Sequence, residues 1–306
     1  MIPLCAPENA KLPTALALGS FDGLHLGHKK VIKAILKEPI GVPTVVSFWP
    51  HPREVLFGES RLRLDLPNEK TFLLEPLGIE QLVLVPFNKN LASKSAETFV
   101  EEVLVKTLHA KHIAVGENFR FGRNREGDTS TLKKIGTSLG IKISIVPIVE
   151  DNHGRLSSSR VRKALNEGDL KHAKYLLKRP YTFRGTVEKG RGLGKKIGWP
   201  TANLKIDGRK FLPSLGVYAA WASIANKKER FLAVMNMGPQ PTIDPNSLSA
   251  VEVHLLDKEI NLLGHELIIE PVQRIRLQKK FDNIATLSKQ ISSDAKLAKE
   301  ILTQKL

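Results

Sequence analysis

The stretch Ala15–Lys30, A-L-A-L-G-S-F-D-G-L-H-L-G-H-K-K, constrains the fold of this chain more than any other. The apolar residues Ala15–Leu18 predict the end of a buried strand, Gly19 and Gly23 interrupt it, and from about Leu26 the pattern becomes helical. The first turn of a helix offers unpaired N–H groups and the positive end of a dipole. The sequence therefore predicts a phosphate site where this strand gives way to this helix.

The two histidines of this stretch, His25 and His28, fall at the predicted junction. Each can donate a hydrogen bond to a phosphoryl oxygen and so stabilise the charge that grows when an α-phosphate is attacked. A histidine pair at a helix start can also merely cap or pack. The whole string, H-x-G-H after a strand and G-x-F-D-G, resembles the signature of the nucleotidyltransferase superfamily, which implies nucleotidyl transfer with release of pyrophosphate.

Length predicts the number of domains, and net charge indicates the class of partner. A chain of 306 residues is expected to form two domains, and 47 basic against 31 acidic residues give a net charge of +16. Sixteen of the basic and only four of the acidic residues lie within Arg155–Lys210. Such an excess indicates anionic partners: nucleotides, nucleic acid or a membrane surface.

Cysteine content and hydropathy bear on location. The single cysteine, Cys5, excludes an internal disulfide framework and a cysteine-based metal site, which fits a reducing cytosol. The N-terminus is too polar for a signal peptide, and no apolar run approaches the length of a membrane span. We therefore expect a cytoplasmic protein without membrane partners, which could form a homo-oligomer.

The first half alternates strands and helices after the opening motif. Expected helices are His28–Leu36, about Glu69–Leu74 and about Ser95–Leu108, and expected strands are Pro43–Trp49, Gln81–Val85, His112–Val115 and Lys142–Val146. This alternation predicts a Rossmann-like α/β domain whose parallel sheet binds ligands at the carboxyl ends of its strands.

Three further segments follow such strands. Phe48–Arg53 (F-W-P-H-P-R) is expected to form a rigid turn, because each proline fixes its own φ and restrains the residue before it. A loop with a purely structural role is the alternative interpretation. Gly116–Asp128 interleaves aromatic residues with arginines, which suits stacking on a flat ring and neutralising phosphate. Leu156–Leu165 (L-S-S-S-R-V-R-K-A-L) has the serine caps of a helix start and two arginines in its first turns.

Together these segments resemble the adenylyltransferase module of the prokaryotic FAD synthetase family, with its G-x-F-D-G-x-H-x-G-H, G-x-x-F-x-F-G and I-S-S-T-x-x-R motifs. The resemblance implies an ATP site formed by Gly19, Phe21, Asp22, Gly23, His25, His28, Ser158, Ser159, Arg160 and Arg162. It also implies that FMN is bound near Asn118, Phe119, Arg120 and Phe121. Three positions depart from the family pattern: Ser20 replaces asparagine, Ser159 replaces threonine, and Asn118 stands where aspartate is frequent.

The pattern changes after a short predicted helix, Asp169–Leu177, which Arg179 and Pro180 end. We place the domain boundary here, giving domains 1–179 and 180–306. Alternating segments then predict a small antiparallel β-barrel, with strands Tyr181–Glu188, Gly216–Ile224, Phe231–Met237, Val251–Leu256 and His265–Val272. Helical spacing over about Ile284–Leu302 predicts a closing helix that packs over the barrel.

The loop Gly190–Asn203, G-R-G-L-G-K-K-I-G-W-P-T-A-N, is the informative part of this half. Its glycines allow backbone N–H groups to wrap a phosphate, and its basic residues add charge, although a flexible linker could have the same composition. The loop ends in Pro200, Thr201 and Asn203, whose hydroxyl and amide are oxygen ligands suited to Mg²⁺.

A phosphoryl acceptor hydroxyl needs a base, and Glu252 on the strand Val251–Leu256 is the candidate, sharing a face with His254. Spacing alone favours an ordinary surface glutamate on an edge strand over a base. The motifs G-x-P-T-A-N, G-V-Y-A, N-x-G-x-x-P-T and V-E-V-H-L-L-D, in this order, resemble riboflavin kinase. The resemblance implies an ATP and flavin site formed by Gly190, Gly192, Gly194, Lys195, Gly198, Pro200, Thr201, Asn203 and Glu252, with Thr201 and Asn203 at Mg²⁺ and Glu252 as the base.

The two resemblances imply a bifunctional enzyme that phosphorylates riboflavin with ATP to FMN and then adenylylates FMN to FAD. Its partners would be ATP, riboflavin, FMN and FAD, with flavins as substrates and products and no nucleic acid. Two alternatives remain at this point: a nucleotidyltransferase for another substrate whose second domain only binds flavin, and a nucleic-acid binder that uses the basic middle segment.

Overall fold

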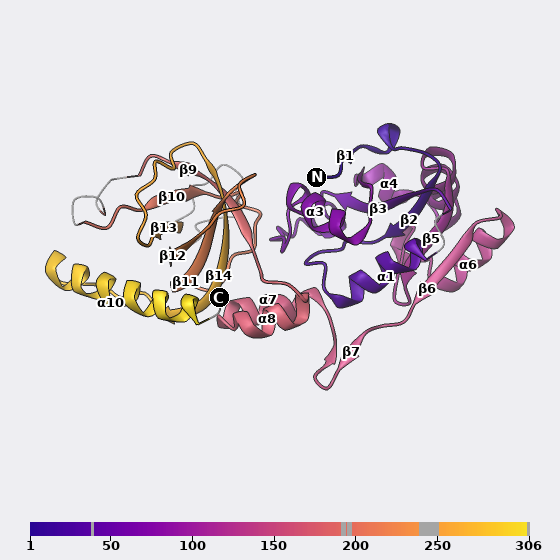
Figure 1. Ribbon diagram of the computed structural model, residues 1–306. Coiled ribbons are helices and arrows are strands. Elements are labelled where there is room, and N and C mark those ends of the chain that lie inside the picture. The colour runs from indigo at the N-terminus through magenta and orange to yellow at the C-terminus, as the bar shows by residue number, and fades with distance from the viewer. Residues whose placement is uncertain (38–39, 191–193, 195–197, 239–250, 305–306) are drawn as a thin grey trace. The chain divides into compact units, whose positions relative to one another are not determined.

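The computed structural model describes residues 1–37, 40–190, 194, 198–238 and 251–304. The chain forms two compact units, which we call the first and second unit (Figure 1). The first unit is Met1–Arg61 with Asp65–Ser158, and the second is Leu62–Leu64 with Ser159–Leu306. No helix in the described part of the chain has the length and apolarity needed to cross a membrane.

A six-stranded sheet forms the centre of the first unit, and all its neighbouring strands are parallel, as predicted. Across the sheet the strands are β1 (Leu4–Cys5), β4 (Gln81–Pro86), β3 (Val42–Trp49), β2 (Thr14–Leu18), β5 (Ala110–Gly116) and β6 (Lys142–Val146). All five residues of β2 are buried. Leu16 and Leu18 belong to one core cluster and Ala15 and Ala17 to another, because alternate side chains point to opposite faces of a strand.

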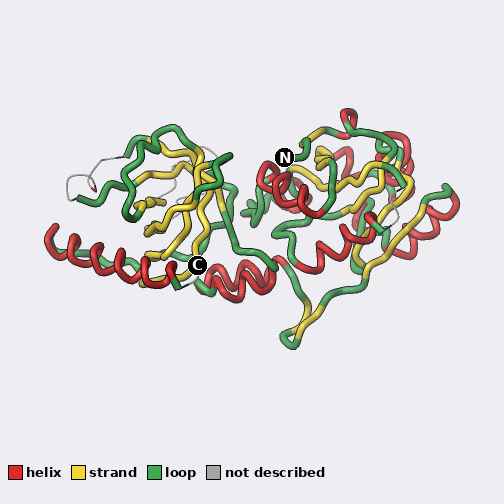
Figure 2. Tube along the Cα trace, in the orientation of Figure 1, coloured by secondary structure: helices red, strands yellow, loops and turns green. Residues whose placement is uncertain are grey.

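Helices connect these strands (Figure 2). They are α1 (Leu26–Leu36), α2 (Pro52–Phe57), α3 (Pro67–Leu74), α4 (Lys89–Ser93), α5 (Ala96–Thr98), the π-helix η3 (Phe99–Thr107), α6 (Thr129–Ser138), and the 3-10 turns η1 (Pro7–Asn9), η2 (Glu75–Leu77) and η4 (Arg123–Arg125). The turn predicted at Phe48–Arg53 leads directly into α2, which the sequence analysis did not include. His51 caps this helix, since its Nδ1 accepts from Arg53 N at 3.1 Å.

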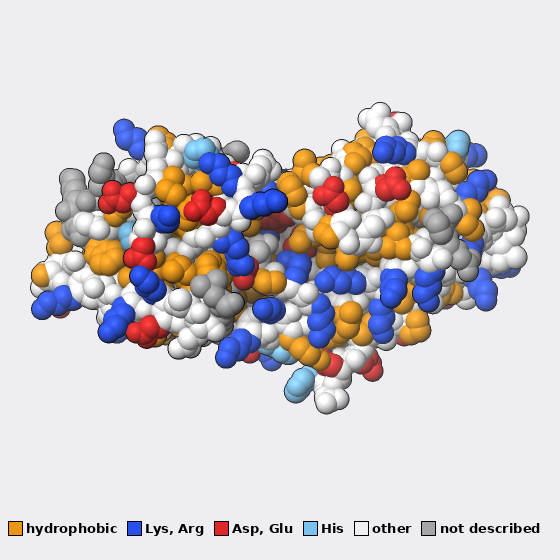
Figure 3. All heavy atoms as spheres, in the orientation of Figure 1, with side chains coloured by type: hydrophobic (Ala, Val, Ile, Leu, Met, Phe, Trp, Pro, Cys, Tyr) orange, Lys and Arg blue, Asp and Glu red, His pale blue; other side chains and the backbone are white. Residues whose placement is uncertain are grey.

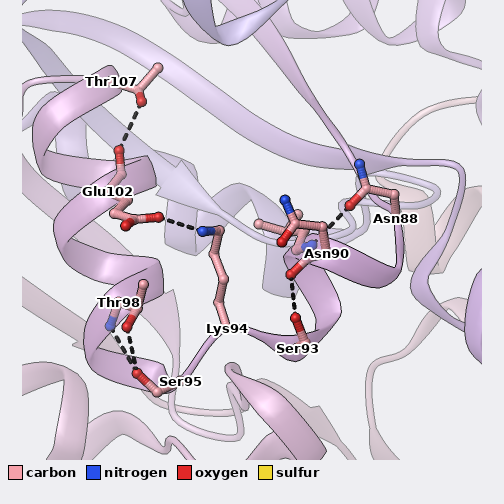
Figure 4. A network of polar contacts seen from close by, with 9 residues as sticks. Asn88, Asn90, Ser93, Lys94, Ser95, Thr98, Glu102 and Thr107 are labelled. Atoms are coloured by element: carbon pink, nitrogen blue, oxygen red, sulfur yellow. Dashed lines mark hydrogen bonds and ion pairs between the residues drawn. The ribbon is translucent and has the colours of Figure 1, made fainter.

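The helix predicted over Ser95–Leu108 forms, but most of it is wound as a π-helix (Figure 4). It begins with a capped turn, where the Ser95 hydroxyl accepts from Thr98 N at 3.1 Å. Lys94 forms an ion pair with Glu102. The Thr107 hydroxyl donates to the Glu102 carbonyl at 2.8 Å, which adds a side-chain bond across the wide turn. Leucine and valine spacing predicts a helix here but does not distinguish a π-helix from an α-helix.

The second unit contains a closed antiparallel barrel, also as predicted. Around the barrel the strands are β10 (Ala202–Lys205), β13 (Val251–Leu255), β12 (Arg230–Met237), β11 (Gly216–Ile224), β14 (Glu266–Arg276) and β9 (Phe183–Glu188). The short strand β10 was not predicted, because the sequence analysis treated its first residues as the end of the glycine-rich loop. The helices α7 (Ser158–Glu167) and α8 (Leu170–Leu177) precede the barrel, and α10 (Ile284–Thr303) follows it.

A three-residue segment from the first half of the chain, Leu62–Leu64, belongs to this second unit. Arg63 N donates to the Arg209 carbonyl and Phe211 N donates to the Arg63 carbonyl, both at 2.7 Å. The fully buried Lys210 donates its Nζ to the Leu64 carbonyl at 2.6 Å. The segment is therefore held by backbone pairing and by a buried cation.

The closing helix α10 packs against the outside of the barrel with a cluster of apolar residues: Val217, Ala219, Trp221, Val234, Leu256, Ala295, Ala298 and Leu302. Beside this cluster the buried Asp294 forms an ion pair with Arg276, with Nη2 and Oδ2 2.8 Å apart. Both carboxylate oxygens also accept from Arg276 Nε, and Gln290 donates to the same group. This bidentate pair ties the helix to β14.

We expect Asp294→Asn to lower the free energy of unfolding of the second unit by about 3–5 kcal/mol, because it leaves the Arg276 charge buried without its counter-ion. The matched control is Asp257→Asn, which removes an exposed ion pair between Asp257 and Lys299 of the same helix α10. This substitution should lower the free energy of unfolding by less than about 1 kcal/mol. Urea unfolding followed by tryptophan fluorescence measures both, since Trp199 and Trp221 pack at this cluster. Equal effects of the two variants would contradict the structural role assigned to Asp294.

Candidate active sites

The loop after β2 carries the first predicted site. Gly19 N donates to the Val46 carbonyl at 3.1 Å, so the loop leaves the sheet directly at the carboxyl end of β2. Phe21 and Leu24 both have left-handed backbone conformations, with φ of 46° and 44°. Such strained residues persist only where the surrounding structure holds them, and both side chains are buried. His25 occupies the N-cap position of α1, and the helix begins at Leu26, where the sequence predicted the pattern to become helical.

The two histidine rings of this loop stack on each other. The ring centroids of His25 and His28 are 3.7 Å apart at an interplanar angle of 22°, and the Phe21 ring meets His28 edge-on at 5.4 Å. The Nδ1 atoms of both histidines are buried and have no hydrogen-bond partner among the described residues. Because buried polar atoms are normally paired, these two nitrogens fit a ligand that supplies hydrogen-bonding oxygens.

Burial keeps both imidazoles neutral near pH 7. It lowers the pKa of His25 to about 4; the nearby Arg155 charge adds to this effect and Asp22 opposes it. Burial also lowers the pKa of His28 well below 6.5, followed by the effects of His25, Lys70 and Arg155. Each ring therefore carries one N–H at neutral pH and acts as a neutral donor.

Polar residues from three further segments meet this loop. The Ser158 hydroxyl donates to the Asp22 carbonyl at 2.8 Å, so the first serine of α7 lies beside the histidine motif, as the family motifs imply. Asp65 N donates to Asp22 Oδ1 at 3.4 Å. The buried Lys70 donates its Nζ to the Ser20 carbonyl at 2.8 Å. Sequence reasoning did not single out Lys70, because it lies on a helix with no motif.

The other residues of the serine and arginine motif, Ser159, Arg160 and Arg162, belong to the second unit. There Arg162 donates its Nη2 to the Leu62 carbonyl at 3.1 Å, and its guanidinium lies 5.7 Å from the centre of the Phe211 ring.

The predicted flavin loop separates into a buried and an accessible part. Phe121 is only 7% exposed and lies in the core against Phe99, with ring centroids 6.0 Å apart. Phe119 stacks on Phe121 at 5.5 Å and is half-buried. Arg120 is exposed and donates to the Phe119 carbonyl at 2.9 Å. Phe119 therefore offers the loop's accessible aromatic surface, while Phe121 supports it from below.

Asn118 lies at the position where the family pattern often has aspartate. With its amide oxygen turned toward the guanidinium, Oδ1 accepts from Arg155 Nη2 at 2.7 Å and from Nη1 at 3.0 Å. Arg155 belongs to the hairpin of β7 (Glu150–Asp151) and β8 (Gly154–Arg155), which the sequence analysis did not predict. Arg155 is thus a further cation of this site. Its position two residues before the three serines was a signal that could have identified it.

In the second unit the barrel gathers polar side chains around Glu252. On β13, Glu252 is directly opposite Asn203 of β10 on one side and Asn236 of β12 on the other. Directly opposed residues of antiparallel strands share a face, so these three side chains form one row. The predicted faces of β13 are confirmed, since Val251 and Val253 are buried and Glu252 is not. Asn236 received no role in the sequence analysis, although it begins a motif quoted there.

The glycine-rich loop runs close to this row. Of its predicted residues, Gly192 and Lys195 lie outside the described part of the chain, whereas Gly190, Gly194 and Gly198 are described. A Cβ on Gly190 would overlap the Asn203 amide nitrogen. A Cβ on Gly194 would overlap the Trp199 carbonyl and come within 3.3 Å of the Thr201 hydroxyl. Glycine is therefore required at both positions for the loop to lie against the segment that carries Thr201 and Asn203.

A metal ion at this second site would bind through oxygen ligands. Among the described residues no group of three or more His, Cys, Asp or Glu side chains is placed to hold a metal. The exposed Thr201 hydroxyl and the partly exposed Asn203 amide fit Mg²⁺, which usually takes few protein ligands and several waters or phosphate oxygens.

Comparison with known proteins identifies a family for each half of the chain. The family model for FAD synthetase matches residues 8–160, and the model for riboflavin kinase matches residues 177–302. The bifunctional riboflavin kinase/FMN adenylyltransferase of Haemophilus influenzae is 35% identical over 295 residues, which cover 93% of each chain. The chain belongs to the bifunctional riboflavin kinase/FMN adenylyltransferase family. The member from Bacillus subtilis is also 35% identical, over 95% of this chain and 92% of its own length.

A solved structure shares the fold over almost the full length of this family member. It is a crystal structure from Streptococcus pneumoniae described as a macrolide-efflux protein, with 30% sequence identity and a TM-score of 0.82. The match covers 97% of this chain and 98% of that one. Both units, and therefore both candidate sites, fall within the matched length.

The neutral state of the histidine pair can be tested by ¹⁵N-histidine NMR. In the folded protein we expect His25 to stay neutral from pH 7.5 down to about pH 5, whereas in the urea-unfolded chain it should titrate near 6.5. Since the unfolded chain then binds more protons, the free energy of unfolding of the first unit should fall as the pH is lowered from 6.5 toward 4. A His25 titration near 6.5 in the folded protein would contradict the desolvated site.

Proposed function

We propose that this chain is a bifunctional enzyme that transfers the γ-phosphoryl group of ATP to riboflavin and then the adenylyl group of a second ATP to FMN. One observation supports the proposal most directly. Each of the two family models matches a part of the chain that has its own candidate phosphate-binding site. The first part has the buried histidine pair, and the second has the Glu252 row beside the glycine-rich loop.

The kinase reaction belongs to the second unit. Glu252 takes the proton from the riboflavin 5′-hydroxyl while the hydroxyl oxygen attacks the γ-phosphorus, and the bond to the β-phosphate oxygen breaks to give FMN and ADP. The register of the three strands places Asn203 and Asn236 on either side of Glu252. Thr201 and Asn203 would hold Mg²⁺ together with the ATP phosphates, where the ion would neutralise phosphate charge.

The adenylyl transfer belongs to the histidine loop of the first unit. An FMN phosphate oxygen attacks the α-phosphorus of ATP, and pyrophosphate leaves, which gives FAD. The FMN phosphate is already anionic near neutral pH, so this step needs positioning and charge stabilisation more than a base. His25 and His28 donate their N–H groups to the phosphoryl oxygens, and α1 presents its N-terminus beside them.

The remaining predicted residues take matching roles. Asn118, Phe119 and Arg120 bind FMN, with Phe119 against the flavin ring, and Phe121 supports this surface. Ser158, Ser159, Arg160 and Arg162 bind the ATP phosphates.

We place the functional boundary between residues 179 and 180, which the start of the riboflavin kinase match at residue 177 supports. Both reactions consume ATP, so we place the enzyme in the cytoplasm.

A time course with the purified protein tests the proposal directly. Riboflavin, ATP and Mg²⁺ are incubated with the protein, and the flavins are separated by chromatography. FMN should form first and FAD after it. FMN without FAD would refute the adenylyltransferase assignment, and flavin binding without turnover would refute the enzyme assignment. Binding of RNA that ATP does not reduce would instead favour a nucleic-acid role for the charged surface, where Lys and Arg side chains are exposed on both units (Figure 3).

Replacing one histidine should separate the two activities. His28→Ala removes a donor to the transferred phosphoryl group and one partner of the ring stack, so we expect FAD formation to fall at least about 100-fold. FMN should still accumulate from riboflavin, because the kinase reaction is assigned to the second unit, and a circular dichroism spectrum like that of the original protein is the control for folding of the first unit. Loss of both activities in a folded variant would contradict the assignment of the two reactions to separate sites.

Replacing the proposed base should have the reverse effect. Glu252→Gln keeps the size and the hydrogen-bonding capacity of the side chain but cannot take a proton, so the kcat for FMN synthesis should fall about 10²–10⁴-fold. Conversion of supplied FMN to FAD should remain unchanged, as measured in the same chromatographic assay. A kinase kcat within a few-fold of the original enzyme would exclude Glu252 as the base.

A further inference from the structure

The segment Trp199–Thr201 is the last part of the glycine-rich loop before β10, and it contains Thr201, one of the two residues proposed to bind Mg²⁺. The backbone ladder between β10 and β13 begins only at Ala202, which lies opposite Val253. Pro200 cannot extend this ladder as a donor, because proline has no N–H group. Some other contact must therefore hold Pro200 and Thr201 beside β13.

His254 supplies this contact from β13 itself. Its Nδ1 lies 2.7 Å from the Pro200 carbonyl oxygen, and since a carbonyl can only accept, Nδ1 carries the proton. The His254 ring also meets Trp199 edge-to-face, with centroids 5.1 Å apart at 72°. One half-buried side chain thus holds two consecutive residues of the connecting segment.

The connecting segment is fixed from its other side as well. Trp199 packs against the apolar cluster beneath α10. Its backbone N–H donates to the Gly194 carbonyl at 2.8 Å. His254 is two residues from Glu252 on the same face of β13, so it links the segment to the strand that carries the proposed base.

We propose that His254 is a positioning residue for the kinase reaction, in which its Nδ1–H fixes the Pro200 carbonyl so that Thr201 and Asn203 stay in reach of the ATP phosphates beside Glu252. This inference rests on the proposed kinase function and extends it to a residue that does not itself touch the reacting atoms.

Three substitutions separate the hydrogen bond from the bulk of the ring. His254→Asn places an amide N–H where Nδ1 lies, His254→Gln places it near the position of Nε2, and His254→Phe keeps an aromatic ring against Trp199 without a donor. We expect His254→Asn to stay within about twofold of the original enzyme. His254→Gln and His254→Phe should lose about five- to tenfold in kcat/KM for MgATP, which is the scale of one neutral hydrogen bond.

The kinetic constant that changes distinguishes a positioning role from a merely structural one. The loss should appear as a higher KM for MgATP with an unchanged KM for riboflavin. Calorimetric titration with MgADP in the absence of riboflavin should show the same order of affinities among the variants. Conversion of FMN to FAD should be unaffected in all three variants, which shows that the first unit is intact, and the unchanged KM for riboflavin shows that the barrel is intact as well.

Two results would overturn the proposal. One is equal behaviour of the Asn and Phe variants, which would mean that the donor is irrelevant. The other is a loss of kcat alone with unchanged MgADP affinity, which would give His254 a part in the chemical step. A failure of the proposed function itself would be seen separately, as the absence of riboflavin phosphorylation by the unsubstituted protein.

Discussion

Closure of the barrel by the four-residue strand β10 is the constraint on which the second site depends. This strand pairs with β9 on one side and β13 on the other, and without it the barrel would have two open edges. The same pairing places Asn203 opposite Glu252. Because the side-chain period of a strand is two, a slip of one residue would turn Asn203 to the other face and remove it from the row. Fold stability and the geometry of the proposed catalytic row thus depend on one register.

The first site depends on a different constraint, the burial of β2 on both faces. A strand with apolar neighbours on each side cannot shift, so the loop at its carboxyl end begins at a fixed point. The left-handed Phe21 and Leu24 and the buried imidazoles are each unfavourable by themselves. Core packing of both side chains and the Lys70 and Ser158 contacts to the loop backbone offset this cost. The protein's own packing and hydrogen bonds therefore hold the two histidine rings in place.

The sequence predicted the elements whose pattern is local. Apolar periodicity identified the main parallel strands, the barrel strands other than β10, and α10, and the motifs indicated the two loops that carry the sites. Long-range pairing could not be predicted in this way. β10 is a strand only because β9 and β13 flank it, since its own sequence, A-N-L-K, shows little β-pattern. Lys70 lies near the histidines through a tertiary contact that no spacing in the chain indicates, whereas Arg155 is two residues before the three serines of a motif already recognised.

The two sites also show why their residues differ in kind. A riboflavin hydroxyl is a poor nucleophile until it loses its proton, so the kinase site needs a group that can accept one, as the proposed base Glu252 would. An FMN phosphate is already anionic, so a base would contribute little to adenylyl transfer. Neutral imidazoles suit that site, since they donate hydrogen bonds to phosphate while Lys70 and Arg155 provide the positive field. The desolvation that lowers the pKa values of His25 and His28 leaves each ring with one N–H group, so the pair can donate hydrogen bonds to phosphoryl oxygens while carrying no charge of its own.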